Sequence, residues 1–227
     1  MERKIILTGD GSHSISVPEL NVAYHSIHGA IQESLHVFIE AGFRHQIRQL
    51  PGKQIAILEV GFGTGLNALL TAIAAEKMER SIYYVALEPN PLNKEEFYSL
   101  NYCELLGRRD RQEDFLRMHE CEWNKIISVT EELLMYKSDS LLQTFEGRTK
   151  FHLIYFDAFA PNAQPQLWTK EVFDKMYSIL QPGGILVTYC SKGEVRSNMI
   201  TAGFEVEKLP GPPGKREMIR ATLPTLR

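Results

Sequence analysis

The chain has 227 residues, of which 44% are hydrophobic and 23% are charged, and its formal net charge is −3. This length and balance suit one domain with a sizeable core and exclude a disordered chain. The slightly negative charge excludes a general attraction to nucleic acid, so any such binding must come from a local surface.

Strands and helices alternate along most of the chain. In chain order we expect β-prone segments at 4–8, 15–17 and 21–25, a helix from about 33 to 48, strand 55–60, helix 66–78, strand 82–87, helices 91–100 and 110–123, strand 132–136, helix 138–145, strand 151–156, helix 166–180, strand 185–189, helix 195–202, and strands 204–209 and 217–223. The Pro-Gly cluster at 210–214 predicts a hairpin turn between the last two strands.

This alternation of apolar strands with helices predicts an α/β fold, with a mostly parallel seven-stranded sheet and helices on both faces. No repeat, linker or low-complexity tract interrupts it. We therefore expect a single domain over 1–227. It would consist of an N-terminal β-hairpin and helix extension at 1–50 and a Rossmann-like core at 51–227.

A glycine-rich segment lies where the first core strand meets its helix. Glycines at such a turn let the backbone approach a ligand, and the helix N-terminus offers free N–H groups. The third glycine comes one position too early for a dinucleotide fingerprint, and the preceding acid would repel a pyrophosphate but suits a cationic ligand. The pattern therefore predicts a class I S-adenosylmethionine site and disfavours NAD. The candidate cofactor ligands are Glu59, Gly61, Phe62, Gly63, Thr64, Gly65 and Asn67.

Acidic residues follow the next two strands at the same edge of the predicted sheet. Glu88 and Pro89 end the second core strand, about 20 residues after the glycines, where an acid can bind ribose hydroxyls. In isolation such a glutamate is more often a surface acid, but the position of Glu88 favours the ribose contact. Asp139 follows the third strand, where it would either accept a hydrogen bond from the adenine amine or cap the helix that follows.

The fourth core strand is followed by the sequence Asp-Ala-Phe-Ala-Pro at 157–161. A carboxylate that emerges from a buried strand cannot face the core unpaired, so we expect Asp157 and Ala158 in the cleft beside the cofactor. Helix capping is the alternative for Asp157. Phe159 would form an aromatic wall, and Pro161 would stiffen the loop.

The remaining composition bounds location and partners. No segment approaches the ~20 apolar residues of a membrane-spanning helix, and the apolar run at 5–7 is too short for a signal peptide, so we expect a cytoplasmic protein with no membrane partner. Cys103, Cys121 and Cys190 have no paired or metal-like spacing and are expected to be buried thiols. The seven histidines form no metal set, so no metal is predicted.

Taken together, these motifs resemble the methyltransferase part of the MnmC family. The resemblance rests on 61–67, 157–161, 168–169, Phe173, 182–184, 202–204 and Gly-Lys-Arg-Glu-Met at 214–218, and near the N-terminus on 10–12, 24–26, 29–30 and Glu33. It covers nearly the whole chain. It implies S-adenosylmethionine-dependent N-methylation of the 5-aminomethyl group of a wobble (2-thio)uridine in tRNA, giving the 5-methylaminomethyl form.

Bifunctional members of that family also carry an FAD-dependent domain that first removes a carboxymethyl group. Because 227 residues leave no room for it, we expect only the methylation step. The implied partner is a tRNA anticodon stem-loop that already bears the 5-aminomethyl group, together with the enzymes that install this group.

The resemblance also implies roles for residues around the acceptor amine. An alkyl amine has a pKa of about 10 and must lose a proton before it attacks the methyl group. Asp157 would be the catalytic residue and orient this amine, although an ionised Asp157 would also raise the amine's pKa, which argues against a strong general base. His25 is either the proton acceptor or a hydrogen-bonded loop histidine. Candidates to line the substrate pocket are Tyr24, His25, Ser26, Glu33, Phe159 and Pro161.

The carboxyl-terminal segment, residues 192–227, has seven basic and four acidic side chains. Such a surface either binds phosphate or is simply solvated. Lys215 and Arg216 would accordingly bind tRNA phosphates or form surface salt bridges.

Two other functions stay open. One is methyl or aminopropyl transfer to a small free amine, which would need an acidic pocket. The other is a non-catalytic, cofactor-binding module associated with RNA. That module would be expected to lack Asp157 or an intact glycine loop, and this sequence has both.

Overall fold

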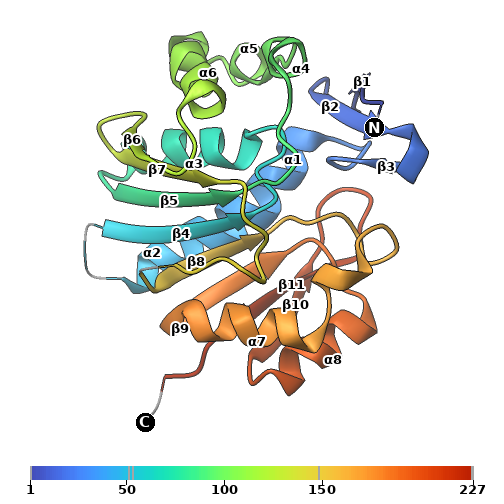
Figure 1. Ribbon diagram of the computed structural model, residues 1–227, viewed down its shortest axis with the longest axis vertical. Helices are drawn as coiled ribbons and strands as arrows, with labels where there is room; N and C mark the ends of the chain where they lie inside the picture. Colours follow the sequence, from blue (N-terminus) through green and yellow to red (C-terminus); the bar gives the residue numbers. More distant parts are fainter. Residues whose placement is uncertain (1, 51, 53, 148, 226–227) are drawn as a thin grey trace.

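A mixed β-sheet with five parallel strands at its centre forms the middle of the protein (Figure 1). The computed structural model describes residues 2–50, 52, 54–147 and 149–225, and within them this sheet has eight strands in the order β10-β11-β9-β8-β4-β5-β7-β6. The parallel strands are β4 (Gln54–Val60), β5 (Ser81–Leu87), β7 (Leu133–Ser138), β8 (Phe151–Phe156) and β9 (Leu180–Thr188). β6 (Ile126–Ser128), β10 (Glu205–Pro210) and β11 (Glu217–Thr222) pair antiparallel.

The sheet confirms the predicted α/β class and its mostly parallel centre, with one strand more than expected. The additional strand, β6, is three residues long, and of its three pairing partners in β7 only Met135 is buried. Ile126 in β6 is largely exposed. A short edge strand of this kind buries too little apolar surface to produce the alternation by which strands are recognised in a sequence.

Helices cover both faces of the sheet, as predicted (Figure 1). One face is covered by a continuous helical segment, made of α1 (Ala30–Ser34), the π-helix η2 (Leu35–Arg44) and α2 (His45–Gln49), and by α3 (Leu66–Lys77). α7 (Lys170–Ile179) and α8 (Gly193–Thr201) cover the other face. The central strand β4 serves both cores, because Ile55 and Ile57 pack on the first side and Ala56 and Leu58 on the second.

The remaining helices of the described residues are short. α4 (Lys94–Tyr98), α5 (Tyr102–Leu105), a 3₁₀ turn at Arg109–Arg111 and α6 (Gln112–Glu120) connect β5 to β6, and further 3₁₀ turns at Pro18–Leu20 and Pro165–Leu167 follow β2 and β8. α4 begins three residues later than the predicted helix, because Asn93 caps it by accepting a hydrogen bond from the Glu96 N–H, while the Glu96 side chain accepts one from Asn93. α5 was not predicted.

The predicted helix at 138–145 is wrong. Ser138 belongs to β7, and residues 139–147 form a loop with a single turn at 142–144. Phe145 donates to the Leu141 carbonyl across 2.9 Å, but no further turn follows, because Leu142 and Phe145 bend into the core. One turn without continuation is not a stable helix.

The first residues form a small antiparallel sheet of their own, β1 (Lys4–Leu7), β2 (His13–Val17) and β3 (Val22–Ala23), in the order β1-β2-β3. The predicted hairpin is therefore present, with a third short strand. Asn101, just before α5, accepts a hydrogen bond from the His13 N–H and donates one to the Gly11 carbonyl, so the small sheet sits beside α4 and α5 (Figure 1).

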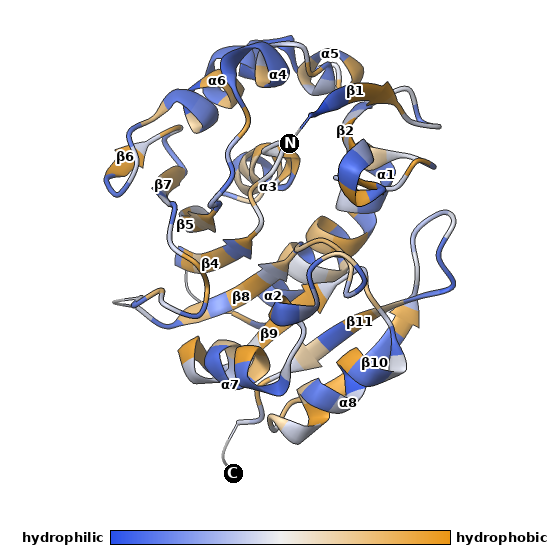
Figure 2. Cartoon of the chain, turned by 45° about the vertical axis from the view of Figure 1, so that its right-hand side comes forward, coloured by the Kyte–Doolittle hydropathy of each residue, from blue (hydrophilic) through white to orange (hydrophobic). Residues whose placement is uncertain are grey.

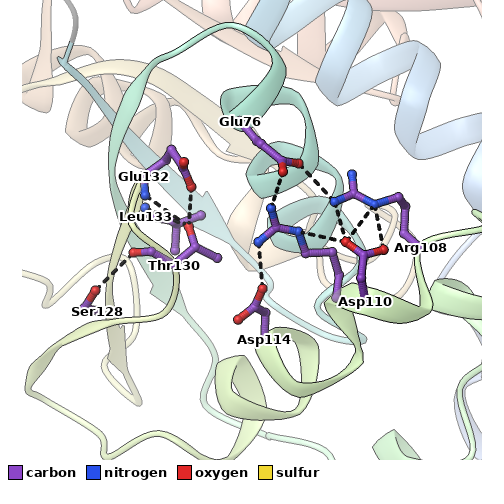
Figure 3. A network of polar contacts seen from close by, with 9 residues as sticks. Glu76, Arg108, Asp110, Asp114, Ser128, Thr130, Glu132 and Leu133 are labelled. Carbon is purple, nitrogen blue, oxygen red and sulfur yellow. Dashed lines mark hydrogen bonds and ion pairs between the residues drawn. The ribbon is translucent and has the colours of Figure 1, made fainter.

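Two polar networks fasten the outer loops (Figure 3). Glu76 at the end of α3 pairs with Arg111 at 2.6 Å and Arg108 at 3.0 Å, and Arg108 also binds Asp110 at 2.7 Å. Through these contacts the charged run at 108–111 joins the segment before α6 to the end of α3. In the second network, Thr130 accepts hydrogen bonds that close the turn between β6 and β7.

The hydrophobic residues of α7 are those that pack into the core. α7 alternates hydrophilic and hydrophobic residues along its ribbon (Figure 2) and buries Val172, Phe173, Met176 and Ile179.

Of the three thiols, Cys103 and Cys190 are buried and Cys121 is only half-buried. Over the described ranges, no helix combines the length and apolar character required to cross a membrane, and no group of His, Cys, Asp or Glu is arranged to hold a metal.

Candidate active site

A cavity of about 1000 Å³, its open mouth included, lies where β4, β5 and β8 end. Ligands of open α/β sheets bind at this carboxyl edge. Val17 at the end of β2 and Tyr24, directly after β3, also line the cavity, so the small N-terminal sheet contributes to its wall. The predicted residues that line the cavity are Tyr24, His25, Gly61, Phe62, Gly63, Thr64, Asn67, Glu88, Pro89, Asp157, Ala158 and Phe159.

The glycine loop needs its glycines. Gly61, Gly63 and Gly65 all have positive φ, at 90°, 51° and 73°. A Cβ at Gly61 would lie 2.7 Å from the Asp157 carbonyl oxygen, and one at Gly65 would lie 2.8 Å from the His119 ring. The bare backbone therefore runs from β4 into α3 along the cavity, as a close-fitting ligand requires.

Glu88, directly after β5, is hydrogen-bonded to this loop. Its carboxylate accepts hydrogen bonds from the N–H of Gly63 at 2.9 Å and of Asn90 at 2.8 Å. Burial raises the pKa of Glu88, while these two hydrogen bonds act in the other direction. Each carboxylate oxygen keeps an unused lone pair, so Glu88 can also accept hydrogen bonds from a diol.

Arg3 holds the loop that carries Glu88. Its guanidinium donates to the carbonyls of Asn90 at 2.6 Å and Pro91 at 3.0 Å, and it pairs with Glu96 at 3.2 Å. Arg3 also lines the cavity. Sequence reasoning missed it, because a single arginine in a charged N-terminal segment gives no sign of a partner almost ninety residues away.

We expect Arg3→Ala to raise the dissociation constant of S-adenosylmethionine about tenfold, because one charge-assisted hydrogen bond is worth about 1.5 kcal/mol. Isothermal titration calorimetry measures this directly. Lys4→Ala is the matched control, since Lys4 pairs with Glu2 at the surface, where both side chains are more than half exposed. Equal affinities of the two variants would contradict a role for Arg3 in the cofactor loop.

Asn67 joins two carboxyl groups at the base of the cavity. Its Nδ2 donates to Glu59 at 3.0 Å and to Asp157 at 2.9 Å. Glu59 is fully buried and does not line the cavity, so it acts through Asn67. Burial, and then the nearby Asp157, raise the pKa of Glu59 well above its usual range.

Glu59 and Asn67 each have one side-chain oxygen that accepts no hydrogen bond from the residues that the structure describes. Among the described residues, Glu59 Oε2 and Asn67 Oδ1 are buried without a hydrogen-bond partner. Two carboxyl groups bridged by one amide do not both ionise readily, and a nearby cation favours the charged forms. The base of the cavity therefore fits a ligand that brings positive charge and hydrogen-bond donors.

Asp157 lines the cavity, and its main chain is fixed by a 3.0 Å hydrogen bond to the Val60 carbonyl. Burial, followed by the charge of Glu33, raises the pKa of its carboxyl to about 7, against the hydrogen bond from Asn67. A carboxyl that titrates near neutrality can accept a proton as well as orient a donor. An ordinary, fully ionised aspartate would raise the pKa of the acceptor amine. An Asp157 carboxyl with a raised pKa does so less.

The loop after Asp157 is held in place by three contacts. Phe159 N–H donates to Gln164 Oε1 at 3.0 Å, Trp168 Nε1 donates to the Phe159 carbonyl at 2.8 Å, and Tyr189 donates to the Ala158 carbonyl at 2.8 Å. Phe159 meets Tyr24 edge-on, with ring centroids 5.1 Å apart. These two rings form an aromatic wall of the cavity, and the Tyr24 ring also packs against the glycine loop, where a Cβ at Gly63 would lie 2.9 Å from it.

His25 lines the cavity but is a poor proton acceptor. Its Nδ1 lies 3.2 Å from the Ser14 hydroxyl and its Nε2 lies 3.4 Å from that of Thr64. Burial lowers the pKa of His25 to about 4. A ring that stays neutral down to that pH has little affinity for a proton, so the structure favours the loop-histidine alternative.

The buried His25 ring should make stability depend on pH. Between pH 6.5 and 4 the unfolded chain binds a proton at His25 and the folded chain does not, so stability is lost as pH falls through this window. From pH 7 to 5 we expect the free energy of unfolding to fall by about 2 kcal/mol more in the wild type than in His25→Gln. Urea unfolding at a series of pH values measures the difference, with the exposed His28→Gln as control. Parallel curves for the wild type and His25→Gln would refute it.

Several predicted residues lie outside the cavity lining. Asp139 is exposed, and with no helix after it there is nothing for it to cap, whereas Ser140, Leu141 and Leu142 line the cavity instead. Gly65 caps α3, and Pro161 is half-buried away from the lining. The other predicted residues outside it are Ser26, Glu33, Glu59, Lys215 and Arg216.

Sequence reasoning also missed residues that do line it. Apart from Arg3, these are Val17, Leu20, Asn90, Gln164, Leu167 and residues 140–142. Most are ordinary apolar side chains on loops or on the small sheet. They carry no chemical signal, and only the folded chain brings them to the glycine loop.

Comparison with known proteins agrees with this geometry. A family model described as S-adenosyl-L-methionine-dependent methyltransferase matches residues 112–224. The tRNA 5-methylaminomethyl-2-thiouridine biosynthesis bifunctional protein MnmC of Aromatoleum aromaticum is 32% identical over 209 residues, which cover 87% of this chain and 32% of that protein. The MnmC of Pseudomonas savastanoi pv. phaseolicola is 29% identical over 210 residues, 88% of this chain and 32% of that protein.

The crystal structure of MNMC2 from Aquifex aeolicus superimposes with a TM-score of 0.79 and 26% identity, over 100% of this chain and 73% of that chain. The chain is an S-adenosyl-L-methionine-dependent methyltransferase related to MnmC. This confirms the predicted fold class, cofactor and family resemblance. The methyltransferase spans about a third of the length of the curated MnmC relatives it matches.

Proposed function

We propose that this methyltransferase transfers a methyl group to the 5-aminomethyl nitrogen of a wobble (2-thio)uridine in tRNA, giving the 5-methylaminomethyl nucleoside. The observation that carries the proposal is Asp157, whose carboxyl faces the cavity beside the glycine loop with its pKa raised to about 7. The relatives are named for tRNA 5-methylaminomethyl-2-thiouridine biosynthesis, and this name supplies the substrate class.

Residues on the β4, β5 and β8 side of the cavity would hold the cofactor. The backbone of Gly61, Gly63 and Thr64 offers a close-fitting surface, and Glu88 can accept hydrogen bonds from the ribose diol. Asn67, held by Glu59, lies where a cationic group would be stabilised. When bound, S-adenosylmethionine supplies an electrophilic methyl group on a positively charged sulfur.

Asp157 would act on the acceptor side. Its carboxylate accepts an N–H of the amine and so turns the nitrogen lone pair towards the cofactor, with positioning as the main contribution. Because its pKa is near 7, Asp157 can also take up the proton that the amine must lose. Tyr24 and Phe159 form the aromatic wall against which a uracil ring would stack.

The tRNA would have to expose the wobble base, since a base must leave its stack to reach an enclosed site. Arg216, exposed on the β10–β11 hairpin, is available for a phosphate contact. The substrate amine must come from enzymes that install the 5-aminomethyl group. A tRNA substrate also implies a cytoplasmic protein.

The substrate class is tested by offering labelled S-adenosylmethionine with two kinds of acceptor. One is tRNA from cells that lack this methyltransferase, and the other is a set of small alkyl amines such as putrescine. We expect label in tRNA and none in the small amines. Label in the amines alone would sink the tRNA proposal and support small-amine transfer.

A further inference from the structure

A buried ion pair joins the carboxyl-terminal hairpin to the start of the α1–η2 segment. Glu33 in α1 is almost completely buried, and one of its oxygens accepts a 2.7 Å hydrogen bond from the Ser26 N–H. The other oxygen pairs with the Lys215 ammonium. Gly214, at φ 83°, lets the hairpin close onto His28, where any Cβ would overlap the ring. The hairpin is therefore shaped to bring Lys215 to Glu33.

Lys215 thus points inward. Its side chain is only 30% exposed, and its Nζ lies 3.8 Å from the centroid of the Tyr189 ring, a cation–π contact. An ammonium group that is committed to a buried carboxylate and an aromatic face is not free to bind a phosphate. Its neighbour Arg216 is exposed. The two basic residues of this hairpin therefore have different surroundings.

The pair lies next to the acceptor side of the site. Tyr189, under Lys215, donates its hydrogen bond to the carbonyl of Ala158, the residue after Asp157. Glu33 raises the pKa of Asp157 and Lys215 lowers it, so both charges reach that carboxyl. The groups that face or influence Asp157 from the surrounding elements are Asn67 on α3, Glu59 on β4, Tyr84 on β5, Glu33 on α1, Tyr189 after β9 and Lys215 on the hairpin.

Charge balance gives the pair a consequence for the reaction. On the acceptor side, away from Glu88, Glu33 is neutralised by Lys215 and Glu59 favours its protonated form, so Asp157 supplies the remaining negative charge there. One negative charge matches one cationic group, which is the sulfonium before transfer and the methylated ammonium after it. A second, uncompensated carboxylate would favour binding the acceptor as an ammonium ion, which has no lone pair to attack with.

We propose that Lys215 is a positioning residue which, by neutralising the buried Glu33, lets the acceptor amine bind in its uncharged, reactive form. This inference rests on the proposed amine methylation. It assigns Lys215 to the electrostatics of the acceptor pocket, in place of the phosphate contact expected from its sequence motif.

The test is the pH dependence of kcat with saturating tRNA that carries the 5-aminomethyl group, because kcat reports the pKa values of groups in the enzyme–substrate complex. In Lys215→Met the buried Glu33 charge is unpaired and raises the pKa of both the amine and Asp157, so the acidic limb should move up by about one pH unit. Glu33→Gln/Lys215→Met removes both charges and should return the limb towards the wild-type position, and Lys215→Arg should keep it there. Lys208→Met is the control, because Lys208 forms an exposed pair with Glu217 on the same hairpin at 2.8 Å.

Other outcomes would overturn the inference. A Lys215→Met enzyme with an unmoved pH profile, but a higher KM for tRNA that depends less steeply on salt, would make Lys215 a phosphate ligand. A shift that persists in Glu33→Gln/Lys215→Met would show that the pair is not its origin. If Lys215→Met does not fold, the double variant and Lys215→Arg still test the idea, because a displaced limb in either contradicts it. Inactivity of the wild type on this tRNA would instead refute the proposed function itself.

Discussion

Asp157→Asn is expected to lower kcat for methyl transfer by about 10²–10⁴-fold, the range that a positioned proton acceptor contributes. Asparagine keeps the size of the side chain and can still accept the 2.9 Å hydrogen bond from Asn67. It cannot take up a proton, and it removes the negative charge that faces the amine. The dissociation constant of S-adenosylmethionine should change by only about threefold, because the glycine loop and Glu88 are untouched.

The comparison needs both readouts, single-turnover rate and cofactor affinity. Asp174→Asn is the matched control, since Asp174 is an exposed carboxylate on α7 that pairs with Lys170. If Asp157→Asn keeps a near-normal rate, Asp157 is not the catalytic residue. If it loses cofactor affinity as strongly as rate, its role lies in binding S-adenosylmethionine.

Gly61→Ala should weaken S-adenosylmethionine binding about 100-fold, which corresponds to about 3 kcal/mol. The backbone at Gly61 has φ 90°, and an added Cβ would lie 2.7 Å from the Asp157 carbonyl oxygen, which belongs to the backbone and cannot swing away. The glycine loop and the Asp157 loop would have to separate. Calorimetric titration with S-adenosylmethionine measures the loss.

Gly107→Ala separates the two causes of this loss. Gly107 also has a positive φ, 64°, but no atom lies within 4 Å of the position of an added Cβ. This variant should lose about 1 kcal/mol of stability from the backbone conformation alone and keep its cofactor affinity. Equal affinities for the Gly61→Ala and Gly107→Ala proteins would contradict the close fit of the two loops.

Local patterns predicted the part of the site that local geometry builds. The glycine loop, Glu88 and Asp157 each follow a strand of the parallel sheet, and the parallel register brings the ends of β4, β5 and β8 together. Alternating apolar segments were sufficient to predict this sheet, apart from the short edge strand β6. The roles assigned to these residues stay predictions.

Contacts distant in sequence were not predictable in the same way. Arg3 reaches the Glu88 loop only because the N-terminal sheet folds over the cavity, and Lys215 reaches Glu33 only because the last hairpin closes on α1. The helix expected at 138–145 fails because Leu142 and Phe145 gain more by packing into the core than by completing a helical turn. Each of these outcomes depends on tertiary packing, which overrides local preference.

The most direct test of the central claim is nucleoside mass spectrometry of tRNA from cells that lack this methyltransferase, after incubation with the purified protein and S-adenosylmethionine. We expect wobble 5-aminomethyl (2-thio)uridine to gain one methyl group and become the 5-methylaminomethyl form, and we expect Asp157→Asn not to produce it. An unchanged nucleoside, or a methyl group on any other nucleoside, would contradict it.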